Sequence, residues 1–177
     1  MVQQPQPINQ ETVFSGRIIE ARVDTVLMPD GKQIIREVVQ HPGAVAIIPI
    51  DREDNVLLVR QYRYPAGQSL LELPAGVIEE GESPDDTAQR ELQEEIGYAT
   101  RDLRALGGVY SSPGFCTEFL YLYIARDLVP SQLPADDDED INVETIPMSR
   151  VDRLIRLGEI QDAKSVAGLL MARYLFK

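Results

Sequence analysis

The chain has 177 residues, of which 44% are hydrophobic, and a formal net charge of −12. A chain of this length can bury one substantial core, and its acidity argues against nonspecific binding to nucleic acid or to an anionic membrane. The single cysteine, Cys116, excludes an intramolecular disulfide framework and fits a reducing compartment.

The first 42 residues separate into two parts. Residues 1–14 are polar at the start and carry no sign of a signal peptide, so we expect a flexible N-terminus and a cytoplasmic protein. Residues 15–42 form a predicted N-terminal β region. In it, a strand over 15–28 and a strand over 33–40 flank the turn Pro29-Asp30-Gly31-Lys32, which is typical of a β-hairpin.

Residues 43–177 are expected to form the main domain. The apolar run 44–50 predicts a strand that is buried on both faces, and 56–62 predicts a second strand after a turn. Further strands are predicted at 105–110, 118–126 and 141–146, and helices at 83–96, from a Ser149 cap to Gly158, and at 163–176. This order of elements favours an α+β sandwich with a mixed sheet. No apolar run approaches the ~20 residues that are needed to cross a bilayer.

The helix at 83–96 has clear boundaries in the sequence. Ser83 is a good N-cap, Pro84 suits the first helical position, and Gly97 can adopt the left-handed conformation that ends a helix. A buried stripe recurs every four residues at Ala88, Leu92 and Ile96.

This helix also carries three carboxylates and a guanidinium within two turns, at Arg90, Glu91, Glu94 and Glu95. Arg90 can pair with Glu94 four residues later. A solvated helix with surface ion pairs is the ordinary explanation, but these glutamates adjoin the apolar stripe and follow a glycine-bearing loop at 73–76. Clustered carboxylates next to a core suit a hard divalent cation, because Mg²⁺ prefers oxygen ligands.

The spacing of these residues resembles the Nudix box. Gly76 is followed after five residues by Glu82, and after seven more by the run Arg90-Glu91-Leu92-x-Glu94-Glu95-x-Gly97. Tyr98 is the one departure, where the family usually has an aliphatic residue. The resemblance implies a Nudix α/β/α sandwich. Pro113, sixteen residues after Gly97, resembles the downstream proline of the ADP-ribose pyrophosphatase branch.

That branch implies hydrolysis of ADP-ribose to AMP and ribose 5-phosphate with Mg²⁺, or with Mn²⁺ as the alternative metal. By the resemblance, Glu91, Glu95 and the Ala75 carbonyl are metal ligands, and Glu94 is a ligand or supports one. Arg90 orients the carboxylates, and Glu82 fixes the loop or supports the metal site.

The general base in this branch comes from an acidic loop after the box. The candidate here is the run 135–141, in which Glu139 is favoured and Asp137 is second, because aspartate stands at 137 where the branch tends to have glutamate. A solvated charge run is an equally good reading of any single residue in it.

Substrate contacts implied by the resemblance are Arg36, Arg63, Glu37 and Pro113. A guanidinium can hold phosphate oxygens in a forked geometry, although a solubility role on a strand edge fits Arg36 equally well. The branch often exchanges N-terminal strands between subunits, so we expect a homodimer formed through residues 15–42.

Alternatives remain open at this point. The residues of the box would contact only the metal and the diphosphate, so a GDP-sugar or a UDP-sugar is an alternative substrate. A non-catalytic Nudix-like sensor of ADP-ribose or a related nucleotide is a second alternative, although all three box glutamates are present. A metal-binding structural protein is a third.

Overall fold

The computed structural model describes residues 4–134 and 141–174. Their contacts divide the chain into two compact units. The first comprises Met1–Gly43 with Tyr110–Phe119, and the second comprises Ala44–Val109 with Leu120–Lys177. The division after residue 43 lies one residue from the boundary that we predicted, but residues 110–119 join the first unit, which the sequence pattern did not indicate.

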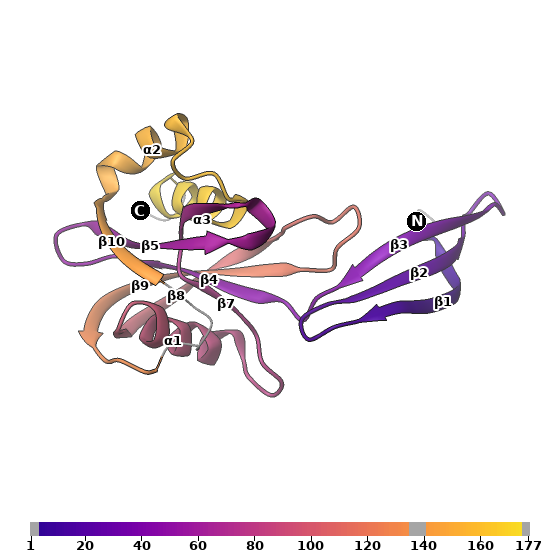
Figure 1. Ribbon diagram of the computed structural model, residues 1–177, viewed down its shortest axis with the longest axis horizontal. Coiled ribbons are helices and arrows are strands. Elements are labelled where there is room, and N and C mark those ends of the chain that lie inside the picture. The colour runs from indigo at the N-terminus through magenta and orange to yellow at the C-terminus, as the bar shows by residue number, and fades with distance from the viewer. Residues whose placement is uncertain (1–3, 135–140, 175–177) are drawn as a thin grey trace. The chain divides into compact units, whose positions relative to one another are not determined.

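The first unit is built on a three-stranded antiparallel sheet of order β1-β2-β3, with β1 at Gln6–Ser15, β2 at Glu20–Leu27 and β3 at Gln33–Gln40 (Figure 1). The hairpin between β2 and β3 was predicted from its turn. The flexible N-terminus predicted for residues 1–14 is wrong for residues 6–14, because these residues pair along β2. β1 was missed because its polar, weakly alternating sequence has no strand signal of its own.

This sheet buries little of its own surface. Every residue of β1 is exposed, including Ile8, Val13 and Phe14, and Asp24 is the only buried residue among its strands. Asp24 accepts hydrogen bonds from Gln10 and Arg22. The segment 110–119 adds a turn to the same unit, and its Cys116 forms a parallel bridge with Val39.

The described residues of the second unit form two sheets. One has the order β7-β4-β9-β8, from β4 at Ala44–Pro49, β7 at Ala75–Val77, β8 at Tyr98–Tyr110 and β9 at Phe119–Pro130. The other has the order β10-β5-β6, from β5 at Asn55–Arg63, β6 at Gln68–Glu72 and β10 at Ile141–Pro147. β4 pairs in parallel with β9 and antiparallel with β7, so the four-stranded sheet is mixed.

In the described part of this unit, three α-helices cover the sheets on opposite faces, with α1 at Pro84–Glu95, α2 at Val151–Leu157 and α3 at Ala163–Tyr174 (Figure 1). Side chains alternate along β4. Val45 and Ile47 pack in the core with α1, whereas Ala46 and Ile48 pack in the core with α2 and α3. Burial on both faces explains the continuous apolar run of β4, and the predicted sandwich is confirmed. None of the helices described is long and apolar enough to cross a membrane.

Several local predictions differ from the structure. A 3₁₀ turn at Met148–Arg150 precedes α2, and no side chain caps that helix, so the predicted Ser149 cap is wrong. Gly158 ends α2 in the left-handed conformation, as predicted. The short strands β6 and β7 were not predicted. Their few residues gain their pairing from β5 and β4, which a local pattern does not reveal.

Candidate active site

Helix α1 forms as its local chemistry predicts. The Ser83 side chain accepts a hydrogen bond from the Asp86 N–H at 3.2 Å and donates one to the Asp86 carboxylate at 2.6 Å. Pro84 stands at the first helical position, and Gly97 follows the helix with a φ of 76°. The stripe Ala88, Leu92 and Ile96 is buried against β4 and β5. The charged groups of the site lie beside this stripe on the same helix.

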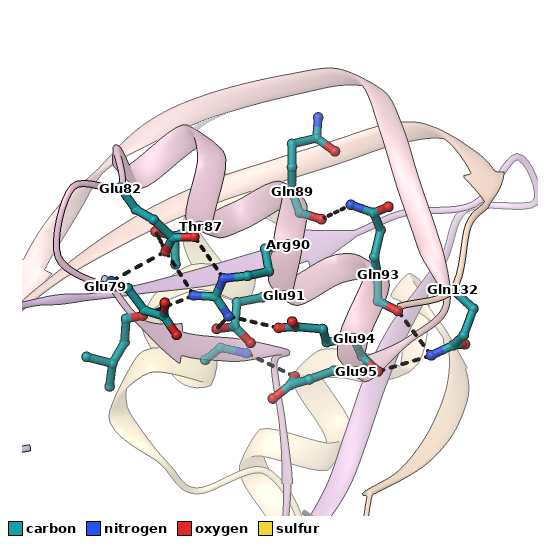
Figure 2. Close-up of polar contacts among 12 residues, drawn as sticks. Glu79, Glu82, Thr87, Gln89, Arg90, Glu91, Gln93, Glu94, Glu95 and Gln132 are labelled. Atoms are coloured by element: carbon teal, nitrogen blue, oxygen red, sulfur yellow. Dashed lines mark hydrogen bonds and ion pairs between the residues drawn. The ribbon is translucent and has the colours of Figure 1, made fainter. Parts of the chain in front are cut away.

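Arg90 is the centre of this charged cluster (Figure 2). Its Nη1 donates to Glu91 at 2.7 Å and to Glu94 at 2.8 Å. Its Nε and Nη2 donate to the two oxygens of Glu82 at 2.9 and 3.0 Å, and Nη2 also reaches the Val77 carbonyl at 3.3 Å. One guanidinium therefore bridges three carboxylates and holds them in fixed directions. The predicted pair of Arg90 with Glu94 is present.

Glu82 joins the loop before α1 to the helix. Hydrogen bonds from the Arg90 guanidinium outweigh the effect of partial burial and, together with hydrogen bonds from Thr87 and Glu79, lower the pKa of Glu82 to about 2. The same carboxylates raise the pKa of Arg90. Thr87, which is fully buried, donates its hydroxyl to Glu82 at 2.8 Å. Sequence reasoning missed Thr87, whose position one turn before Glu91 on the same helix was the available signal.

The backbone of β7 approaches two of the glutamates closely. The Ala75 N–H donates to the Glu95 carboxylate at 3.1 Å. A Cβ on Gly76 would lie 1.7 Å from Oε1 of Glu91, so no side chain fits at this position. Glu91 and Glu95 are both buried, with 7% and 6% of their surface exposed. The loop and the helix thus bring the Ala75–Gly76 backbone and two carboxylates into one compact group.

This group of donors fits a hard divalent cation. Within residues 4–134 and 141–174, no three His, Cys, Asp or Glu side chains surround a point that could hold a metal ion. Magnesium does not need such a cage, because it usually binds through one or two carboxylates and completes its shell with water and substrate phosphates. Glu91, Glu95 and Glu94 supply carboxylate oxygens, and Gly76 leaves no Cβ between the backbone and Glu91.

The acidic run 135–141 is flanked by segments anchored beside α1. The Ser131 N–H donates to the Gly97 carbonyl, and the Leu133 N–H donates to the Gln93 carbonyl. Gln132 donates to the carbonyls of Gln93 and Glu94 at the end of the helix (Figure 2). At the end of the run, Ile141 pairs with Gln61 on β5 and packs against the α1 core. Asp137 and Glu139 themselves lie outside the described residues.

The predicted substrate residues fall in different places. Arg63, on β5, directs Nε and Nη2 to the buried Glu72 at 2.8 to 3.2 Å. Arg36 and Glu37 are exposed on β3, and Pro113 is exposed in the turn at 112–116, so these three residues belong to the first unit. Ala75, Arg90, Glu91, Glu94 and Glu95 are the predicted residues that the structure brings together.

Comparison with known proteins agrees with this geometry. The NUDIX domain family matches residues 40–169, and a nucleoside diphosphate sugar hydrolase N-terminal domain matches residues 6–39. An ADP-ribose pyrophosphatase of Bacillus subtilis is 38% identical over 89% of this chain and 86% of its own length. A methanol dehydrogenase activator of Bacillus methanolicus is 42% identical over 90% of this chain and 87% of its own length. A crystal structure of an ADP compounds hydrolase superposes with a TM-score of 0.88 and 27% identity, over 99% of this chain and 95% of the other.

Proposed function

Because the chain belongs to the Nudix family, we propose that it hydrolyses nucleoside diphosphate sugars, and ADP-ribose to AMP and ribose 5-phosphate in particular. Relatives named ADP-ribose pyrophosphatase, 38% identical in both Bacillus subtilis and Mycobacterium tuberculosis, support this substrate. A relative named GDP-mannose pyrophosphatase is 34% identical over 79% of the chain, so GDP-sugars form the alternative substrate class.

The observation that carries the proposal is the arrangement of Glu91, Glu94 and Glu95 by Arg90 beside the Ala75–Gly76 backbone. Cleavage of a diphosphate needs charge neutralisation, an oriented water and a base. Glu91, Glu95 and the Ala75 carbonyl would hold Mg²⁺ or Mn²⁺, with Glu94 as a further ligand. The bound metal would supply charge neutralisation and water activation. Arg90 offsets the repulsion between the carboxylates of Glu91 and Glu94 and holds both in place, and Glu82 in turn holds Arg90.

The base is proposed to come from the acidic run, with Glu139 before Asp137. Its flanks are anchored at the end of α1, by Leu133, and at β5, by Ile141, and this placement supports a role near the carboxylate helix. A base must come within hydrogen-bond reach of the attacking water.

Substrate binding is proposed to involve Arg36, Arg63, Glu37 and Pro113, with a homodimer formed through the N-terminal sheet. The apolar side chains of Ile8, Val13, Phe14 and Ile35 on this sheet are 50% to 58% exposed, which supports a surface that binds a second copy of the chain. A chain that lacks residues 1–40 should be a monomer with poor activity, as measured by light scattering and by turnover. An active, soluble monomer would contradict the assignment.

A substrate panel tests the function directly. The protein is incubated with ADP-ribose, GDP-mannose and UDP-glucose, each with Mg²⁺, with Mn²⁺ or with a chelator, and release of AMP, GMP or UMP is followed. We expect metal-dependent AMP release to be the fastest. Binding of ADP-ribose without release from any substrate would favour the sensor alternative. We propose a cytoplasmic location, in keeping with the single cysteine.

A further inference from the structure

The four residues before Gly76 are held by contacts from α3, β5, β4 and α1. The Glu72 side chain is paired with Arg63 and Lys164, and the Leu73 N–H donates to the Ser165 hydroxyl at 2.7 Å. The Pro74 carbonyl accepts from the Ile47 N–H at 2.9 Å, and the Ala75 N–H donates to Glu95 at 3.1 Å. An unbroken set of contacts therefore runs from helix α3 and strands β4 and β5 to the carboxylate helix.

Glu72 is the most unusual member of this set. It is 1% exposed, and burial of a carboxylate is costly unless cations and hydrogen bonds compensate for it. Burial raises the pKa of Glu72, but Arg63 and Lys164 outweigh that effect and leave the pKa below its ordinary value. Glu72 therefore stays ionised, and its carboxylate binds α3 to β5 through two cations.

The two α3 residues that contact Glu72 and Leu73 are themselves held in place by Asp162. Asp162 accepts hydrogen bonds from the Ser165 N–H at 3.1 Å and from Lys164 at 3.0 Å. Lys164 is 14% exposed at its side chain, and Ser165 is fully buried. Neither Lys164 nor Ser165 belongs to the cluster around Arg90, and a role in core packing alone would not require an ammonium group that is only 14% exposed.

We infer that Lys164 and Ser165 are positioning residues that set the Ala75 carbonyl and Gly76 against Glu91 and Glu95, and thereby set the affinity of the site for a divalent cation. They act through Glu72 and Leu73, which are three and two residues before Ala75. This inference rests on the metal site of the proposed function. Its physical basis is that contacts behind metal ligands orient those ligands, and that their loss typically costs 10–100-fold in metal affinity or activity.

The test measures Mn²⁺ binding to the full chain by electron paramagnetic resonance, without substrate. Lys164→Met should weaken Mn²⁺ binding about tenfold, Ser165→Ala should weaken it by a smaller factor, and Lys164→Arg should keep more affinity than Lys164→Met. Arg173→Met is the matched control, because Arg173 also lies on α3 but directs its guanidinium to Asp152, at 3.2 Å, and to the Met148 carbonyl. It should lower the thermal stability and leave Mn²⁺ binding unchanged.

The outcomes separate the inference from the proposed function. Wild-type Mn²⁺ affinity in folded Lys164→Met and Ser165→Ala would overturn the inference, and so would equal weakening in Arg173→Met or a wild-type chain that binds no Mn²⁺. If Lys164→Met does not fold, the milder Ser165→Ala decides, and unchanged affinity there overturns the inference. A wild-type chain that binds Mn²⁺ but hydrolyses no nucleoside diphosphate sugar would refute the proposed function alone.

Discussion

Replacement of Gly76 with alanine should disable the site through a single methyl group. The added Cβ would lie 1.7 Å from Oε1 of Glu91 and 2.0 Å from its Cδ, whereas real Cβ atoms essentially never approach closer than 3.0 Å. The Glu91 carboxylate must therefore move by roughly 1.3 Å, or β7 must shift. Because a displacement of about 1 Å in a catalytic group can cost on the order of 100-fold, we expect kcat/KM to fall about 100-fold. Such a fall corresponds to about 2.7 kcal/mol of lost transition-state stabilisation.

The assay is metal-dependent release of AMP, combined with thermal unfolding of the single and double variants. The three atoms nearest to the added Cβ all belong to Glu91, so the clash depends on that side chain. Gly76→Ala should therefore lower the free energy of unfolding in the wild-type chain, and it should lower that energy much less in a Glu91→Ala background. Near wild-type kcat/KM in Gly76→Ala, or equal destabilisation in both backgrounds, would refute the reasoning.

Three further predictions concern the charged groups. Glu95→Gln should lower turnover at saturating Mg²⁺ by more than about 100-fold, since a metal ligand should matter at least as much as the groups behind it. Circular dichroism should show an intact fold, and near wild-type turnover would exclude Glu95 as a ligand. Arg90→Met should reduce stability at neutral pH. Because the folded pKa of Glu82 is about 2 and its ordinary value is 4.5, the stability from this pair is complete above about pH 4.5 and is lost as the pH falls toward 2. Chemical denaturation should accordingly show the difference between wild type and Arg90→Met shrinking across that window, and a constant difference would contradict the pairing. Glu139→Gln should slow turnover far more than Asp137→Asn, and small, equal effects in rate measurements would remove both residues as the base.

Features with local causes could be predicted from the order of the residues. Ser83, Pro84 and Gly97 specify the ends of α1 through capping and backbone conformation, and the spacing of Ala88, Leu92 and Ile96 specifies its buried face. The same spacing fixes which glutamates share one side of the helix, so the carboxylate cluster follows from the helical period. The apolar run of β4 likewise predicted a strand covered on both faces.

Pairing between strands that are distant in the sequence could not be predicted from such local patterns. β1 carries no strand signal and is ordered by its register with β2, and the three residues of β7 are a strand only because β4 lies beside them. Residues 110–119 join the first unit through the bridge from Val39 to Cys116, whose partners are far apart in the sequence.

The way in which the loop and the helix meet depends on long-range packing and could not be predicted. The sequence placed a glycine at 76 and a glutamate at 91, but their contact depends on how β7 folds against α1. Arg63, predicted to bind substrate, proved to be paired with Glu72, and Lys164 completes that pair from 92 residues further along the chain. Helical geometry repeats every few residues and can be read locally, whereas a buried ion pair between distant segments exists only when packing has brought both partners together.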